Sequence, residues 1–232
     1  CVDTPAGLEA ALEGGADRIE LCSALALGGL TPSVGLMALA AQTQVPVRAM
    51  IRPREGHFIF DAAECDMMLR DIDAARVVGL EGVVIGASTE SGGLDMQILK
   101  RLAAHAAGMA ITLHRVVDLL NDPTEAVDLA IALNLSTILT SGGAARAIDG
   151  LDGIAAMQDR AGDRIEILAG GGVTAENVLT ILAATGIGSV HASCSRPAPA
   201  ATSRLLELGF EAANRRMTDR AVVAALRHAT RA

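Results

Sequence analysis

The stretch Arg18-Ile19-Glu20-Leu21-Cys22 alternates aliphatic residues with polar or charged ones. Successive side chains of a β-strand point to opposite faces, so this stretch predicts a strand with one apolar face and one polar face. Four further stretches repeat the pattern: Val47-Arg48-Ala49-Met50-Ile51-Arg52, Ala110-Ile111-Thr112-Leu113-His114, Ile165-Glu166-Ile167-Leu168 and Ser189-Val190-His191-Ala192-Ser193. In an antiparallel sheet the polar faces would meet water, but the wide spacing of these stretches predicts that they meet one another in a ligand site.

Strand-like and helical segments alternate along the whole chain. We expect strands at 1–3, 18–22, 47–52, 82–86, 110–115, 137–141, 165–169 and 189–193. Helices are expected at 5–14, 32–42, 61–78, 95–106, 123–133, 145–161, 175–184 and 219–229, and a long last loop with a short helix at 195–216. Eight such units predict an α/β fold, a single (β/α)8 TIM barrel domain over residues 1–232. The alternative is an open doubly wound sheet, whose central strands would be continuous apolar runs, and only 82–86 has that character.

The composition excludes several classes of function. The chain of 232 residues has a net charge of −8, three Phe and neither Trp nor Tyr, which argues against a nucleic-acid partner. No apolar run approaches the roughly 20 residues of a membrane span, and no signal peptide is recognised. Four widely spaced cysteines without a CxxC pair predict reduced thiols in a cytoplasmic protein. Because the chain opens inside a strand-like segment, we expect natural residues before Cys1.

Polar residues are expected to gather where the barrel strands end, since catalytic residues of this architecture come from several strand ends. Glu20, Arg52, His114 and the later Asp118 supply a candidate acid, base and anion clamp at that mouth. The alternatives are a structural ion pair between Glu20 and Arg52 and a core histidine at 114. Lys100 is the only lysine and lies in a helical segment, so Schiff-base aldolase chemistry is excluded.

Glycine-rich strand ends and arginines predict an anion site at the same mouth. Glycines that follow late barrel strands often offer backbone N–H groups to phosphate, although a tight turn without a ligand is the alternative. Arg54 lies in a long loop, 52–60, which is either a lid over an anionic ligand or a surface flap at a subunit contact. The candidate anion-binding residues are Arg52, Arg54, Arg115, Ser141, Gly142, Gly171, Gly172, His191 and Ser193.

These motifs, taken in order, resemble the CutC copper-homeostasis family. The resemblance rests on Cys1-Val2-Asp3, Gly14-Gly15-Ala16-Asp17-Arg18-Ile19-Glu20-Leu21-Cys22-Ser23, Gly28-Gly29-Leu30-Thr31-Pro32-Ser33, Ile51-Arg52-Pro53-Arg54, Gly82-Val83-Val84-Ile85-Gly86, Leu113-His114-Arg115, Ile138-Leu139-Thr140-Ser141-Gly142-Gly143, Gly170-Gly171-Gly172-Val173 and His191-Ala192-Ser193. It implies a TIM barrel, a cytoplasmic location, a homodimer or higher homo-oligomer, and a role in copper homeostasis. One departure is Val116-Val117, where the family usually has a small residue and Phe.

The copper role implied by this resemblance would use soft ligands. Cu(I) prefers thiolates, and Cys1 and Cys22 are inward-facing on adjacent predicted strands, with Met50 on the next. Free cysteines are also often simply buried. The alternative function is an enzyme for a small anionic metabolite, phosphorylated or carboxylated, in which Glu20 or His114 transfers protons and Arg52 and Arg54 hold the anion. A barrel scaffold without chemistry is a third alternative.

Overall fold

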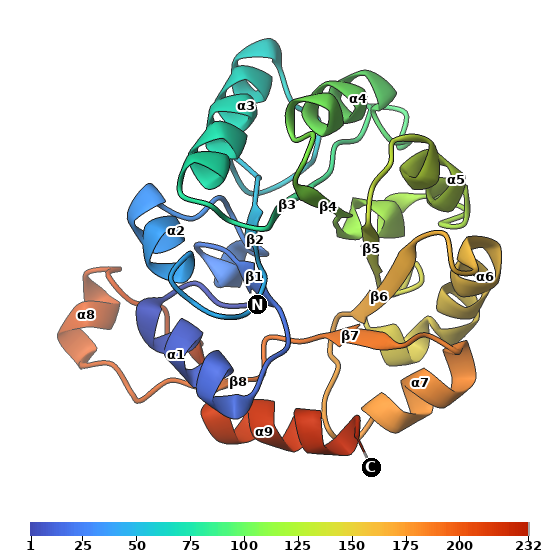
Figure 1. The fold of residues 1–232 in the computed structure, drawn as a ribbon. Coiled ribbons are helices and arrows are strands. Elements are labelled where there is room, and N and C mark those ends of the chain that lie inside the picture. Colours follow the sequence, from blue (N-terminus) through green and yellow to red (C-terminus); the bar gives the residue numbers. More distant parts are fainter. Residues whose placement is uncertain (232) are drawn as a thin grey trace.

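A computed structural model describes residues 1–231 as a ring of parallel strands. Seven strands pair in sequence order and the sheet curls into the ring seen in Figure 1. They are β1 (Ile19–Leu21), β2 (Val47–Met50), β3 (Gly82–Ile85), β4 (Ala110–Leu113), β5 (Thr137–Thr140), β6 (Glu166–Gly170) and β7 (Ser189–His191). The expected strand at 1–3 is only a bridge from Val2 to Leu21, and the Cys1 nitrogen donates to the Ala192 carbonyl at 2.9 Å. This segment takes the eighth position, and the TIM-barrel fold is confirmed.

Helices cover the outside of the ring (Figure 1). They are α1 (Pro5–Gly14), α2 (Val34–Ala40), α3 (Ala62–Val77), α4 (Met96–His105), α5 (Glu125–Ala132), α6 (Leu151–Ala161), α7 (Val178–Thr185) and α9 (Arg220–Ala229). Short 3-10 helices follow three strands: η1 (Leu25–Leu27), η2 (Arg115–Leu119) and η3 (Ala147–Asp149). None of the helices in residues 1–231 combines the length and apolar character needed to cross a membrane.

Side-chain caps fix where several helices begin. Thr4 Oγ1 accepts a hydrogen bond from the Gly7 N–H at 3.0 Å, and Pro5 occupies the first helical position of α1. At α3, Asp61 and Glu64 each accept a hydrogen bond from the other's backbone N–H and so form a capping box. These caps fix the residue at which each helix begins, and so which of its side chains face the barrel.

The aliphatic phase of the strands forms the core between sheet and helices, as the alternation predicts. Ile19, Leu21, Ile85, Leu113 and Ile138 are all at most 2% exposed and belong to one hydrophobic cluster. Their burial leaves the alternate positions facing the barrel axis. The polar phase therefore lines the interior.

A layer of polar side chains, which we call the polar floor, crosses the barrel near the beginning of the strands. The Arg48 guanidinium donates to Glu81 at 2.9 Å and to the Thr112 and Thr137 hydroxyls, each at 2.8 Å. Thr137 donates to Glu166 at 2.8 Å, and Glu166 also pairs with Arg18 at 3.0 Å. Partly exposed carboxylates thus compensate the charge of the buried Arg48 guanidinium, and the polar floor joins the beginnings of several strands.

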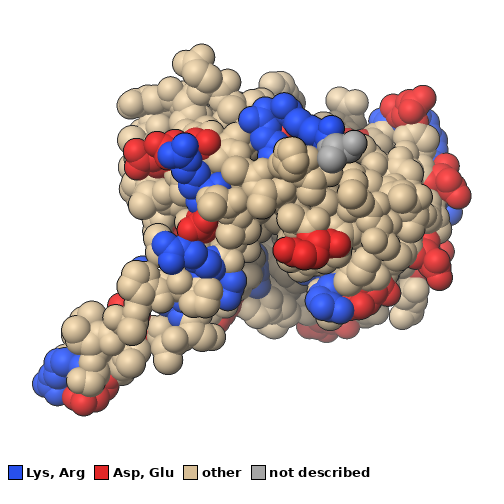
Figure 2. Space-filling model, turned by 90° about the horizontal axis from the view of Figure 1, so that it is seen from below, with Lys and Arg blue, Asp and Glu red and all other residues tan. Residues whose placement is uncertain are grey.

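The segment after β7 contains the expected short helix, but an antiparallel strand pair flanks it where only a loop was expected. β8 (Ser195–Pro197) and β9 (Arg216–Thr218) form an antiparallel pair, and α8 (Ser203–Glu207) lies between them in the chain. This arm projects from the barrel in Figure 2 and exposes Leu208 and Phe210. Neither Ser195–Pro197 nor Arg216–Thr218 contains Val, Ile or Leu, so the sequence there lacks the aliphatic alternation that marks the barrel strands.

Candidate functional site

A cavity of about 290 Å3 opens among the carboxyl ends of the strands and the loops beyond them. Its polar wall brings together eight predicted site residues and one predicted thiol: Glu20, Arg52, His114, Arg115, Gly171, Gly172, His191, Ser193 and Cys1. Leu25, Gly28, Met50, Phe58, Leu139, Val173 and Ala192 complete the wall. Five predicted residues are not part of it: Arg54, Asp118, Ser141, Gly142 and Cys22.

Glu20, on β1, is the only acidic side chain in this wall within residues 1–231. Its Oε1 lies 3.5 Å from Nε2 of His191 on β7 and 3.7 Å from the Cys22 Sγ. Burial by itself would raise the pKa of Glu20, but the charge and hydrogen bond of His191, followed by the positive amino group of Cys1 and by His114, outweigh burial and the pKa falls to about 2. The structure therefore holds a carboxylate anion in the cavity at neutral pH.

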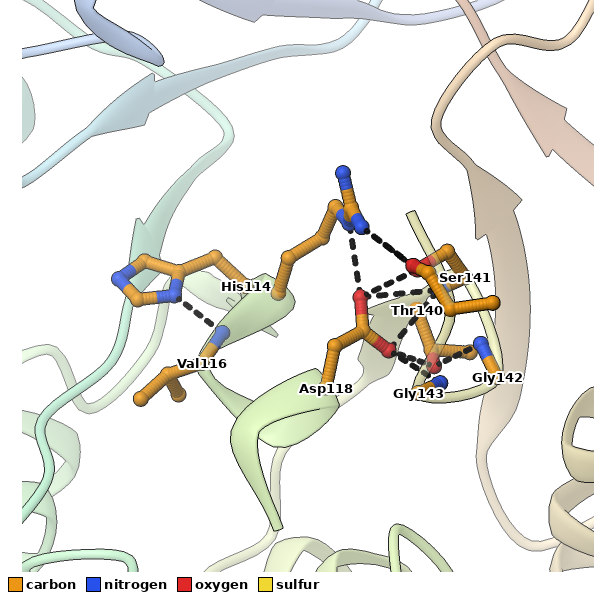
Figure 3. Close-up of polar contacts among 9 residues, drawn as sticks. His114, Val116, Asp118, Thr140, Ser141, Gly142 and Gly143 are labelled. Atoms are coloured by element: carbon orange, nitrogen blue, oxygen red, sulfur yellow. Dashed lines mark hydrogen bonds and ion pairs between the residues drawn. The ribbon is translucent and has the colours of Figure 1, made fainter. Parts of the chain in front are cut away.

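His114 presents a hydrogen-bond donor to the same cavity. The Val116 N–H donates to its Nδ1 at 3.1 Å, because His114 caps the first turn of η2 (Figure 3). An accepting Nδ1 carries no proton, so the neutral ring has its proton on Nε2. Burial lowers the pKa of His114 to about 4; the Glu20 charge opposes this shift and the Arg52 charge adds to it. The ring is neutral at pH 7, and within residues 1–231 its buried Nε2 has no hydrogen-bond partner.

A glycine at the end of β3 makes room for this ring. A Cβ on Gly86 would lie 2.1 Å from Cε1 of His114, well inside van der Waals contact. Phe58 from the loop after β2 also packs against this ring, with 4.8 Å between the ring centroids. The parity of the strands did not identify Gly86, although a glycine at a strand end is a general sign of close approach.

Arg52 lies at the end of β2 and is 6% exposed, but it does not pair with Glu20. Its guanidinium donates to the backbone carbonyls of Leu27, Gly29 and Gly56 at 3.0, 3.1 and 3.1 Å, and it stacks over Phe58 at 4.9 Å. It thereby ties the η1 loop to the loop after β2. Its buried Nε has no partner in the described chain, so one N–H remains for a ligand.

Arg54 lies outside the cavity wall, contrary to its expected position over a ligand. It pairs with Glu64 at the start of α3 and donates to the Ile59 carbonyl at 2.8 Å. These contacts fold the loop after β2 on itself. Spacing along the sequence could not distinguish this pairing from a reach across the cavity.

Asp118 also lies outside the wall, where it joins η2 to the loop after β5 (Figure 3). Its carboxylate accepts hydrogen bonds from the Thr140 hydroxyl at 2.6 Å, the Ser141 N–H at 3.0 Å and the Gly143 N–H at 3.1 Å. Arg115 Nε donates to it at 2.7 Å. A carboxylate with this many donors has no free lone pair for proton transfer, so Asp118 positions Arg115.

Ser141 and Gly142 are likewise engaged in packing. Ser141 Oγ lies 2.8 Å from Asp118 and accepts from Arg115 Nη2 at 2.6 Å. A Cβ on Gly142, whose φ is +73°, would lie 2.1 Å from the Gly150 carbonyl before α6. This part of the predicted anion site therefore supports the wall from behind.

One group of possible metal ligands lies at the mouth. Ligand atoms of Cys1, Glu20 and His191 all lie within 4.8 Å of one another. Cys22 is outside this group and packs with Met50 and Val84, and burial followed by the Glu20 charge raises its pKa well above the usual value. The donors that meet are one thiol, one carboxylate and one imidazole. These mixed donors suit a borderline divalent cation. They are not the two thiolates that were expected to bind Cu(I).

Chemically, the mouth combines one carboxylate anion with several unpartnered N–H donors. A carboxylate can accept a proton from a substrate, and a neutral imidazole N–H can stabilise a negative oxygen that develops as the proton leaves. No lysine of residues 1–231 reaches the cavity wall, since Lys100 lies in α4.

Comparisons with known proteins identify the family. The model of the CutC family matches residues 1–196. CutC family proteins of Sinorhizobium medicae and Caulobacter vibrioides are 53% and 50% identical, over 98% and 100% of this chain and 93% and 96% of theirs. The solved CutC structure of Streptococcus agalactiae, named for copper homeostasis, is 34% identical with a TM-score of 0.73, over 76% of this chain and 88% of its own. This chain therefore belongs to the CutC family.

Proposed function

We propose that the mouth of the barrel is an active site for proton transfer next to the carbonyl group of a small anionic metabolite. The observation that carries the proposal is the buried, unpartnered Nε2–H of His114 in the same cavity as the Glu20 carboxylate. A buried donor without a protein partner costs stability, and a ligand oxygen would satisfy it.

The two residues divide the reaction between them. Glu20 removes a proton from the carbon next to the carbonyl, and the C–H electron pair becomes the new C=C bond. The carbonyl oxygen takes the negative charge and accepts a hydrogen bond from Nε2 of His114. Return of the proton to the same carbon or to its neighbour completes an exchange or an isomerisation. The step needs neither an oxidant nor a further reactant.

His191 adjusts the basicity of Glu20. Because burial raises the pKa of Glu20 and His191 lowers it, the charge state of Glu20 depends on this neighbour. A base works best when its pKa lies near the working pH. Binding of a substrate that displaces His191 from the 3.5 Å contact would raise the pKa of Glu20 towards that range.

Solvent exchange tests this function without knowledge of the natural substrate. The protein is mixed in D2O with a panel of small carboxylated and phosphorylated aldehydes and ketones, and loss of the C–H signal next to the carbonyl is followed by proton NMR. We expect catalysed exchange in at least one compound. A panel in which no compound exchanges faster than in buffer would contradict the proposal.

Metal binding is the second candidate function, and the Cys1, Glu20 and His191 group supports it. The solved relative named for copper homeostasis makes copper the metal to test, in a cytoplasm that keeps thiols reduced. All four cysteines are free in the structure. A metal held by Glu20 would prevent that carboxylate from accepting a proton. The two candidates therefore compete for one carboxylate, and added metal should slow exchange.

Copper titration against a strong chelator, without oxygen, tests the second candidate. We expect Cys1→Ser and His191→Gln each to weaken binding at least tenfold, because each removes one of only three donors. Cys65→Ala is the matched control, since Cys65 is packed in the core away from the mouth. Loss of binding in Cys22→Ser with retention in Cys1→Ser would contradict this ligand set.

A further inference from the structure

The turn after β6 holds two successive glycines in a braced, left-handed conformation. Gly171 and Gly172 have φ values of +99° and +69°, which side-chain-bearing residues rarely adopt. The Ala147 N–H donates to the Gly171 carbonyl at 2.8 Å, and Asn177 Nδ2 donates to the Gly172 carbonyl at 2.9 Å. Both carbonyls are thus fixed from outside the cavity.

The N–H groups of this turn are available to a ligand. Within residues 1–231, the N–H groups of Gly171, Gly172 and Val173 donate to no acceptor, and all three residues line the cavity. Successive backbone N–H groups in a turn of this kind form a concave site for an anion. The absence of Cβ atoms also matters, because a Cβ on Gly171 would lie 3.1 Å from Nη1 of Arg115.

Arg115 supplies a fixed positive charge beside these N–H groups. Its Nε donates to Asp118 at 2.7 Å, and its Nη2 donates to Ser141 at 2.6 Å and to the Ala144 carbonyl at 3.1 Å. The remaining nitrogen, Nη1, has no partner in the described chain and is the atom nearest to the Gly171 position. The guanidinium is therefore oriented in advance, with one edge left for a ligand.

We infer that Arg115 and the turn at Gly171–Gly172 bind the phosphate group of the substrate. The donors of this site come from one side chain and from consecutive backbone N–H groups, and they are arranged around one point. This arrangement matches the three terminal oxygens of a tetrahedral phosphate better than the two oxygens of a planar carboxylate. The inference rests on the proposed function and names its substrate class. The substrate is a small phosphate monoester that carries a carbonyl group between the phosphate site and Glu20 and His114.

The volume of the cavity suits a small substrate. About 290 Å3 lies just below the range of roughly 300–1,000 Å3 for ligand sites. A second cavity of about 370 Å3 continues from Glu20 and His191 into the barrel interior. A short phosphorylated aldehyde or ketone fits the space at the mouth.

Inorganic phosphate is the probe that tests the inference, with binding followed by 31P NMR and calorimetry. Arg115→Met should weaken phosphate binding about tenfold or more, because it removes the one cationic donor of the site. Arg146→Met is the matched control: Arg146 lies near Gly172, but it pairs with Asp149 at 2.8 Å and does not line the cavity. Arg115→Lys, which keeps the charge but not the planar geometry, serves if the Met variant does not fold.

The outcomes separate this inference from the proposed function. The phosphate site would be supported if wild type, Arg146→Met and Glu20→Gln bind phosphate and Arg115→Met does not. Unchanged binding in Arg115→Met and Arg115→Lys, or no measurable phosphate binding in wild type, would overturn it. Tighter binding of acetate than of phosphate would also overturn the phosphate site. Catalysed exchange of a carboxylated compound would in that case still support the proposed function.

Discussion

Glu20→Gln is expected to lower the rate of catalysed C–H exchange about a hundred- to ten-thousand-fold, the range typical of a lost general base. Glutamine has nearly the same shape as glutamate, but its amide cannot accept the substrate proton. The change also removes the charge that lies 3.5 Å from His191 and 3.7 Å from the Cys22 thiol. Exchange is measured by proton NMR in D2O, on any compound that wild type exchanges.

A second glutamate provides the control for that result. Glu55 is exposed in the loop after β2 and is absent from the cavity wall, so Glu55→Gln should exchange at the wild-type rate. Thermal unfolding of both variants shows whether the fold is intact. If folded Glu20→Gln retained exchange within about threefold of wild type, Glu20 would not be the base.

Arg48→Met is expected to cost about 2 kcal/mol or more of unfolding free energy, because it removes the hydrogen bonds of a buried guanidinium to partners that stay buried. Methionine fills similar space, but Glu81, Thr112 and Thr137 lose their donor. Glu81 is partly exposed and can be solvated, whereas the two threonine hydroxyls are buried and cannot. Urea unfolding measures the change.

Arg101→Met is the matched control for the polar floor. Arg101 pairs with Asp66 across exposed helix surfaces, with side chains 50% and 60% exposed, and such pairs contribute about 0–1 kcal/mol. A loss in Arg48→Met no larger than the loss in Arg101→Met would show that the polar floor does not stabilise the barrel. Arg48→Lys, which keeps the charge, should lose less than Arg48→Met.

The architecture could be predicted because strand parity is a local property. The alternation of residues 18–22 decided which side chains face the helices, and Ile19 and Leu21 are buried there as expected. The same parity placed Glu20, His114 and His191 on the inner face. Parity could not predict that segment 1–3 forms only a single bridge. It also could not predict the pairing of β8 with β9 in the arm after β7.

The pairing of long side chains could not be predicted in the same way. Arg54 reaches Glu64 rather than the cavity, and Arg52 binds backbone carbonyls rather than Glu20, because a guanidinium on a long stem has several partners within reach. The polar floor was missed for a different reason. Arg48 and Glu166 belong to the polar phase, but they lie near the beginnings of β2 and β6. Site residues of this architecture are expected at the opposite, carboxyl ends of the strands.

Asp118 shows that sequence position alone does not predict the role of a residue beyond the strand ends. It follows His114 by one turn of η2, and its sequence position fits a catalytic acid as well as a positioning residue. Only the hydrogen bonds to Thr140, Ser141 and Gly143 distinguish the two roles. Gly86, by contrast, carried a usable signal, since a glycine at the end of an apolar strand indicates that another group approaches closely.

The protonation state of His114 is the most direct test of the proposed chemistry, and 15N NMR of histidine-labelled protein measures it. The chain has five histidines, so His114→Gln identifies the relevant signal. Because burial lowers the pKa to about 4, the ring should remain neutral, with its proton on Nε2, as the pH falls from 8 to about 5. An imidazolium at pH 7, or a neutral ring with its proton on Nδ1, would contradict the role of His114 as the donor to the substrate oxygen.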